Sequence, residues 1–207
     1  MRRRRISMTP AGRRALLGLA ALLPAPALHA QRSGIGRVEA LRGSAVAEAA
    51  GARRDLAPAA SVFDGDLVAT AEESRMTLRL AEAMEIRLGA AVRLRIDRFL
   101  ARVGGTLVLE RGAMLVDRPA GGGTPPGLAV RGPFGLIAVR GTRFFAGPSN
   151  GVFGVFVERG SVLLAADNQA VEIMPGFGAD IRAPGAAPTA PVRWGAPRIA
   201  AALASVG

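Results

Sequence analysis

The chain has 207 residues, of which 50% are hydrophobic and 21% are charged, so it can bury one sizeable core and one domain is expected. It has no Cys and no Tyr, and its one His, His29, lies close to the N-terminus. His29 lies in the predicted leader described next, so we expect the mature chain to have no His. This removes disulfides, thiolate nucleophiles, Ser–His triads and nearly all zinc or transition-metal sites, and it leaves carboxylates alone for catalysis. We therefore expect no cofactor, no metal and no enzymatic activity.

Residues 1–30 have the anatomy of a secretory signal peptide. Arginines at 2–5 and 13–14 form a basic segment, and the apolar run 15–23 that follows is too short to span a bilayer comfortably. Small residues before Gln31 suit cleavage, and the arginine pair is compatible with twin-arginine export as well as with the general secretory route. We expect an exported, periplasmic protein without a stable membrane span, or a membrane-tethered one if the leader stays attached.

Charge argues against a nucleic-acid partner. All 27 basic residues are Arg, and removal of the leader takes away six of them and no acidic residue, so the net charge falls from +11 to +5. No stretch of the remaining chain interleaves basic residues with aromatic ones, as a nucleic-acid surface would require.

Strand-like segments fill the chain from Gly34 to Arg182. Some of them alternate apolar residues with Arg or Thr, as 76–80 and 92–96 do, which is typical of strands with one wet face. Others, such as 152–157, are apolar on both faces, as expected for strands that are covered on both sides. We predict an all-β domain over 31–182, built as a β-sandwich or a short solenoid-like β-roll of many short strands.

An internal repeat supports the β-roll. Residues 107–116 align with 155–164, and 38–47 is a looser third copy. Each copy has an apolar strand, a polar pair, a Gly and a second apolar strand. We expect each Gly to adopt a backbone conformation that other residues avoid, at a tight corner or a bulge.

The last segment, 183–207, changes character. It begins as an Ala/Pro linker, and Pro197 can start a short helix with Ile199, Leu203 and Val206 on one face. Trp194 lies just before this helix. Our main expectation is that the helix docks back on the β-domain through Trp194; in the alternative, the tail is exposed and Trp194, Ile199 and Leu203 bind a partner.

Several segments, in order, resemble parts of a FecR domain. They are 36–43, 62–70, 74–80 and 139–144, and 154–162 and 174–176 fit the end of such a domain. The motif residues, which the resemblance implies to be structural, are Gly65, Asp66, Thr70, Arg140, Gly141, Thr142, Phe144 and Gly160. In the first motif, Asp side chains beside Gly65 can cap turn amides.

The second motif holds an arginine in an apolar strand. We expect Arg140 to be partly buried and paired with Glu110 or Glu158, and Thr142 to bond to the backbone near the corner. Both roles would be structural.

The resemblance implies a non-catalytic extracytoplasmic domain that binds a protein partner or an envelope signal, related to the periplasmic sensing part of iron-uptake sigma regulators. Because 14 residues precede the apolar run, it implies the sensing domain alone. We expect a membrane or outer-membrane protein as the partner, bound at a strand edge or at the tail. The alternative is a cell-envelope glycan-binding or structural module that uses arginine-lined strand faces, although only 4% of the residues are aromatic.

Overall fold

The computed structural model describes residues 34–81, 83–100, 104–118 and 127–207, without the side chains of Phe99, Leu100 and Arg140. All of these residues belong to one compact unit, Arg32–Gly207. The expected signal peptide lies outside the described residues and stays a prediction.

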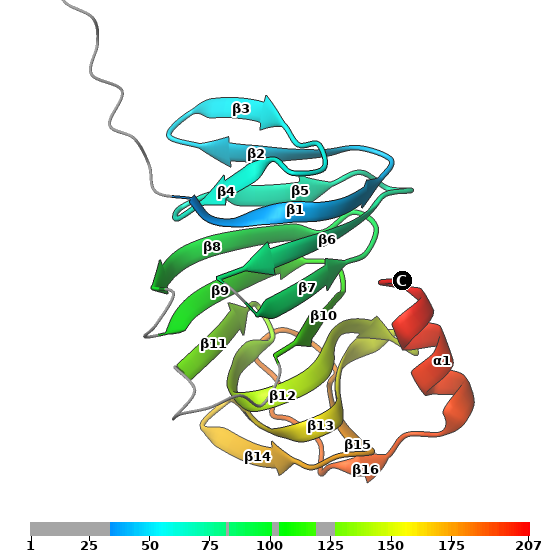
Figure 1. The fold of residues 1–207 in the computed structure, drawn as a ribbon. Coiled ribbons are helices and arrows are strands. Elements are labelled where there is room, and N and C mark those ends of the chain that lie inside the picture. The colour runs from blue at the N-terminus through cyan, green and yellow to red at the C-terminus, as the bar shows by residue number, and fades with distance from the viewer. Residues whose placement is uncertain (1–33, 82, 101–103, 119–126) are drawn as a thin grey trace, which may run out of the picture. The chain divides into compact units, whose positions relative to one another are not determined.

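The described residues form sixteen strands in one sheet and one short helix (Figure 1), which confirms the all-β prediction. The elements are β1 Gly34–Arg42, β2 Ala45–Ala49, β3 Ala52–Asp55, β4 Ser61–Phe63, β5 Leu67–Thr70, β6 Arg75–Leu80, β7 Met84–Leu88, β8 Arg93–Leu100, β9 Gly104–Arg111, β10 Met114–Asp117, β11 Gly127–Gly132, β12 Gly135–Ser149, β13 Val152–Ala166, β14 Gln169–Ile173, β15 Phe177–Ile181, β16 Val192–Arg193 and α1 Ala196–Ala204. In this part of the chain, no helix has the length and apolar character needed to cross a membrane.

The sheet runs in the order β3-β2-β5-β8-β9-β11-β12-β10-β7-β6-β1-β4, and β13 adds to it by pairing with β12, β14 and β15. All pairings are antiparallel except that of β9 with β11. Strands from the first 30 described residues, 34–63, stand at both ends of this order, and buried side chains from both ends join one main core. The sheet therefore curls around its core, as a roll does.

Period-two alternation of side chains builds the core. In β6 and β7 every second residue is buried, and Leu78, Leu80 and Ile86 have no exposed surface. Arginines occupy the positions between them, such as Arg79 and Arg87, and keep their charged ends in water. The alternation read from the sequence therefore gives the correct inward face for these strands.

The two longest strands, β12 and β13, bend where the second motif lies. The first part of β12 pairs with β11, and its last part, from Arg143 onward, pairs with β10. Before the bend Ile137 and Val139 point into the main core, and after it Phe144 and Ala146 do, so the inward positions change from odd to even. The register with β13 shifts at the same place. One extra residue in each strand therefore lets β12 and β13 pass together from one side of the roll to another.

The glycines of the internal repeat share one conformation, as predicted. Gly43, Gly112 and Gly160 have φ of +82°, +92° and +79°, in the left-handed region. Gly43 and Gly112 lie between two strands, whereas Gly160 lies inside β13 and forms a bulge. The same local unit therefore ends a strand in two copies and bends a continuous strand in the third.

Candidate partner-binding surfaces

The first motif ties a turn to a neighbouring strand. The Asp66 side chain is fully buried, and its Oδ2 accepts a hydrogen bond of 2.9 Å from the Phe63 backbone N–H and pairs with the Arg54 guanidinium. The backbone N–H of Ile96 on β8 donates to the Asp66 carbonyl at 2.9 Å. Gly65 has φ +83°. Asp66 thus caps a turn amide and holds the β4–β5 turn against β8.

Thr70 ends this motif with a buried hydroxyl that has two partners. Its Oγ1 donates to the Gly89 carbonyl at 2.7 Å and accepts from the Val92 backbone N–H at 2.9 Å. One side chain thus satisfies two backbone polar groups of the loop before β8, which gives Thr70 a structural role.

The second motif forms the bend itself. Gly141 has φ +61°, and a Cβ on Gly160 would lie 2.5 Å from Thr142 Cγ2 and 2.7 Å from the Gly141 carbonyl. Thr142 and Phe144 are fully buried. The expected side-chain hydrogen bond of Thr142 is wrong, because its Oγ1 has no partner among the described residues. Its carbonyl instead accepts from the Arg118 backbone N–H at 3.0 Å.

The expected ion pair of Arg140 stays a prediction, because that side chain lies outside the described part of the chain. Its backbone pairs with Ser161 on β13. The two carboxylates expected to receive it already contact other arginines: Glu110 contacts Arg93 and Arg95, and Glu158 contacts Arg143. The described motif residues lie in turns or in the interior, which supports the structural roles that the resemblance implied.

The C-terminal helix docks on the outside of the sheet, beyond the main core. Trp194, 6% exposed, stacks on Phe156 with ring centroids 5.2 Å apart and tilts against Phe145 at 6.5 Å. Ala202 and Val206 join this second core, and Ile199 and Leu203 pack against it, half-buried. The helix is docked, as our main expectation from the sequence held. Partner binding through Trp194, Ile199 and Leu203 stays a prediction.

Two glycines make room for the indole, a feature that sequence reasoning missed. A Cβ on Gly178 of β15 would lie 2.3 Å from Trp194 Nε1, and one on Gly154 of β13 would lie 2.8 Å from Trp194 Cη2. Arg198 lies over the other side of the ring, with its guanidinium carbon 3.6 Å from the centroid, and binds both oxygens of Asp180 at 2.6 and 3.1 Å. The ring is therefore enclosed between strands and a guanidinium.

Beside the helix, the outer face carries a row of ion pairs. Arg143 bonds to Asp117 at 2.6 Å and to Glu158, and Arg159 bonds to Asp117 at 2.7 Å. Burial alone would raise the pKa of Asp117, but the hydrogen bonds from both arginines outweigh it and hold that pKa below its usual value. Farther along, the hydrogen bond from Arg79 lowers the pKa of Glu39.

A hollow of about 430 Å³ lies between β1, β6, β7 and the end of α1. Its charged lining includes Glu39, Glu85, Arg42, Arg75 and Arg87, so it carries both signs. An open hollow of mixed charge suits a polar segment of a protein better than an apolar small molecule.

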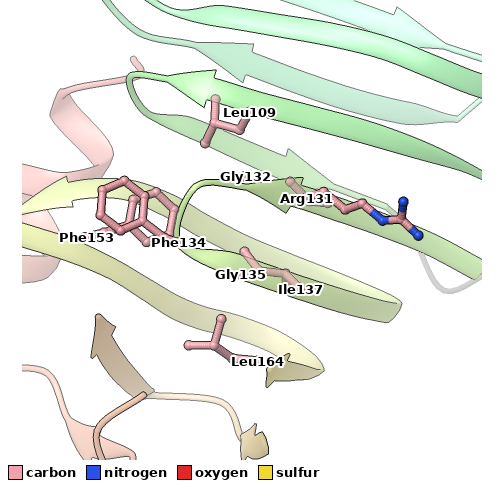
Figure 2. Close-up of a pocket in the computed structure, with 9 residues that line it drawn as sticks. Leu109, Arg131, Gly132, Phe134, Gly135, Ile137, Phe153 and Leu164 are labelled. Atoms are coloured by element: carbon pink, nitrogen blue, oxygen red, sulfur yellow. The ribbon is translucent and has the colours of Figure 1, made fainter. Parts of the chain in front are cut away.

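A smaller depression lies at the β11–β12 hairpin, where Phe134 stacks on Phe153 with centroids 4.5 Å apart (Figure 2). Leu109, Ile137 and Leu164 line it, and its volume of about 10 Å³ admits one water at most. It is a packing defect at the end of the core rather than a ligand site. Among the described residues, no three His, Asp or Glu side chains gather closely enough to hold a metal ion.

The outer face of β8, β9, β11, β12, β13 and β14 has no covering element among the described residues. Ala138 and Leu163 are opposite each other on β12 and β13, and the Leu163 side chain is 45% exposed. On β8, Arg93 and Arg95 share Glu110 at 3.2 and 3.0 Å, so part of the arginine charge of this face is neutralised.

Comparison with known proteins agrees with this fold. Residues 66–163 match the family model described as FecR protein. No curated protein shows a significant match to the chain.

Two crystal structures, each of a "putative anti-sigma factor" from Parabacteroides distasonis ATCC 8503 and solved at 2.50 and 1.65 Å resolution, are similar to it, both with a TM-score of 0.55 at 13% identity. The match covers 66% of this chain and 63% or 64% of those chains, so this chain spans less than two thirds of their length. At this identity the likeness shows the shared fold.

Proposed function

We propose that this protein, which carries a FecR domain, is a non-catalytic extracytoplasmic module that binds a protein partner of the cell envelope and takes part in regulatory sensing. The family match over 66–163 carries this proposal. The structural likeness to the Parabacteroides proteins, described as anti-sigma factors, supports the regulatory part. The basic and apolar leader, 1–30, supports export to the periplasm.

The partner surface that we propose consists of α1 and the hollow beside it. Ile199 and Leu203 keep some exposed surface there, and charged residues of β1, β6 and β7 line the hollow. Half-buried apolar side chains next to charges of both signs suit a protein contact with an apolar centre and a polar rim. The motif residues, by contrast, are enclosed in the fold.

Site-specific photocrosslinking in the source cells tests this function. A photoreactive residue at exposed Ala200 or Ala204 of α1 should crosslink one defined envelope protein, and the same residue at exposed Ala52 of β3 should not. Because an apolar contact depends little on ionic strength, the crosslink should persist at high salt. Crosslinks to polysaccharide alone, at low salt only, would instead support the glycan-binding alternative. Equal crosslinks from Ala52 would contradict the proposed surface.

A further inference from the structure

The uncovered outer face contains a row of six residues that are direct neighbours across six strands. The register joins each one to the next, from β8 through β9, β11, β12 and β13 to β14, and these strands follow one another in Figure 1. The row reads Arg98, Thr106, Ala129, Ala138, Leu163, Glu172. The two central side chains are small and apolar, and the row has a positive charge at one end and a negative charge at the other.

The two end charges are available. Arg98 and Glu172 are exposed, and neither forms an ion pair with another residue of the described chain. Strands about 4.8 Å apart put them roughly 24 Å from each other, at opposite ends of the face. The small side chains of Ala129 and Ala138 between them allow another sheet to approach closely, at about 10 Å.

We infer that this face binds the same face of a second copy of the chain, about a two-fold axis that lies between the sheets and runs parallel to the strands. Such an axis reverses the row, so Arg98 faces Glu172 of the second copy and Ala129 faces its Ala138. Thr106 faces Leu163 in the same way. The face is thus complementary to itself in charge.

The neighbouring row fits the same arrangement. It reads Arg95, Val108, Arg131, Leu136, Ala165, Ala170 from β8 to β14. Reversal places Arg95 over Ala170 and Arg131 over Leu136 of the second copy, so no arginine lies directly opposite another arginine. A two-fold axis perpendicular to the strands would place β8, which is rich in arginine, over β8 of the second copy. The like charges would repel each other, so we choose the axis parallel to the strands.

The size of the face sets the strength of the dimer. Two or three side-chain rows over six strands measure about 24 by 14 Å, which is below the roughly 800 Å² per partner of a standard stable interface. We therefore expect a weak, reversible dimer. It uses a different surface from α1, and the inference does not rest on the proposed function.

Sedimentation equilibrium over a wide concentration range tests the dimer with protein produced from the full 207-residue sequence. Wild type should show a reversible monomer–dimer equilibrium. Leu163→Arg replaces an apolar side chain of the face with a long charged one directly beside Glu172. The new guanidinium would draw Glu172 away from Arg98 of the second copy and lie close to that arginine, so it should raise the Kd at least about tenfold. The matched control Val192→Arg changes a strand residue of comparable exposure, 54% against 45% for Leu163, that lies outside the face, and it should leave the Kd unchanged. A monomer at every concentration, or a dimer insensitive to Leu163→Arg, would overturn the inference.

Charge reversal tests the geometry. Arg98→Glu and Glu172→Arg should each weaken the dimer, because each brings like charges together, and the double variant should restore wild-type affinity. These exposed residues can change without loss of the fold, which a thermal unfolding curve verifies. Single variants that weaken the dimer without rescue by the double variant would exclude the strand-parallel axis. Crosslinking from Ala200 tests the envelope partner independently, so the two ideas can fail separately.

Discussion

The bend divides the outer face of strands β12 and β13 into two halves, and only one half is covered. On the side of β10, the outward residues are Phe145 and Phe156, and Trp194 and α1 cover them. On the side of β11 and β14, the outward residues are Ala138 and Leu163, and no described element covers them. The same two strands therefore carry a second core in one half and an open surface in the other.

The bend at Gly141 and Gly160 makes this division possible. Because it changes which alternate residues face inward, large aromatic side chains can lie outside in one half while small ones lie outside in the other. Aromatic rings outside a sheet require a cover, and alanines do not, so residue size decides where the helix docks.

The largest loss of stability should come from a methyl group added at the bend. Gly160→Ala combines a left-handed φ with a Cβ 2.5 Å from Thr142 Cγ2, and we expect a loss of about 4 kcal/mol in the free energy of unfolding. Gly151→Ala is the control, because Gly151 has φ +78° but an added Cβ would meet no atom within 4 Å, so it should cost about 1 kcal/mol. Urea denaturation measures both. Equal losses would mean that the bend tolerates the methyl group.

Removal of the cover tests the covered half. Trp194→Ala should cost about 3 kcal/mol, since the indole fills the space left by Gly154 and Gly178. Leu163→Ala, on the open half, should lower the free energy of unfolding by less than about 0.5 kcal/mol when it is measured at a protein concentration where the chain is monomeric. Thermal unfolding followed by circular dichroism gives both values. A large loss for Leu163→Ala would show that the open half is packed in solution.

A smaller effect, of opposite sign, should appear at Thr142. Its buried Oγ1 lacks a partner among the described residues, so Thr142→Val replaces an unsatisfied hydroxyl with a methyl group of similar size. We expect a gain of about 1 kcal/mol in the free energy of unfolding. Thr70→Val is the contrast and should be destabilising, because the Thr70 hydroxyl has two partners. Destabilisation by Thr142→Val would indicate that the hydroxyl has a partner in solution.

The smallest effect concerns the ion pairs beside the helix. Because the pKa of Asp117 is lowered in the folded state, its stabilising contribution is present above its unfolded pKa, near 4, and is lost as the pH falls through the folded value. Asp117→Asn should lower Tm at pH 7 and reduce the fall in Tm below about pH 4. Glu172→Gln, at an exposed carboxylate that takes no part in these ion pairs, should leave Tm unchanged at pH 7 when it is measured at a concentration where the protein is monomeric. If Asp117→Asn showed the same fall in Tm at acid pH as wild type, other carboxylates would be responsible for that fall.

The strands themselves could be predicted because their signal is local. Alternation over 76–80 and 92–96 identified the inward residues, and the repeated Gly of the strand–Gly–strand unit identified Gly43, Gly112 and Gly160. The Thr142 hydrogen bond could not be predicted, because the partners of a buried hydroxyl come from residues distant in the chain. The pocket for Trp194 was missed for the same reason: Gly154 and Gly178 resemble any other strand glycines.

The sequence by itself determined the all-β class, the alternating faces and the amphipathic tail helix, since each depends on residues a few positions apart. Only the tertiary structure decided the parallel pairing of β9 with β11, the passage of β12 and β13 around the bend, and which outer face is covered. It also places alanines in the left-handed region, at Ala59 and Ala91, where their N–H groups bond to the carbonyls of Val38 and Ala71. Such hydrogen bonds join distant segments and offset a local strain that the sequence alone would predict to be avoided.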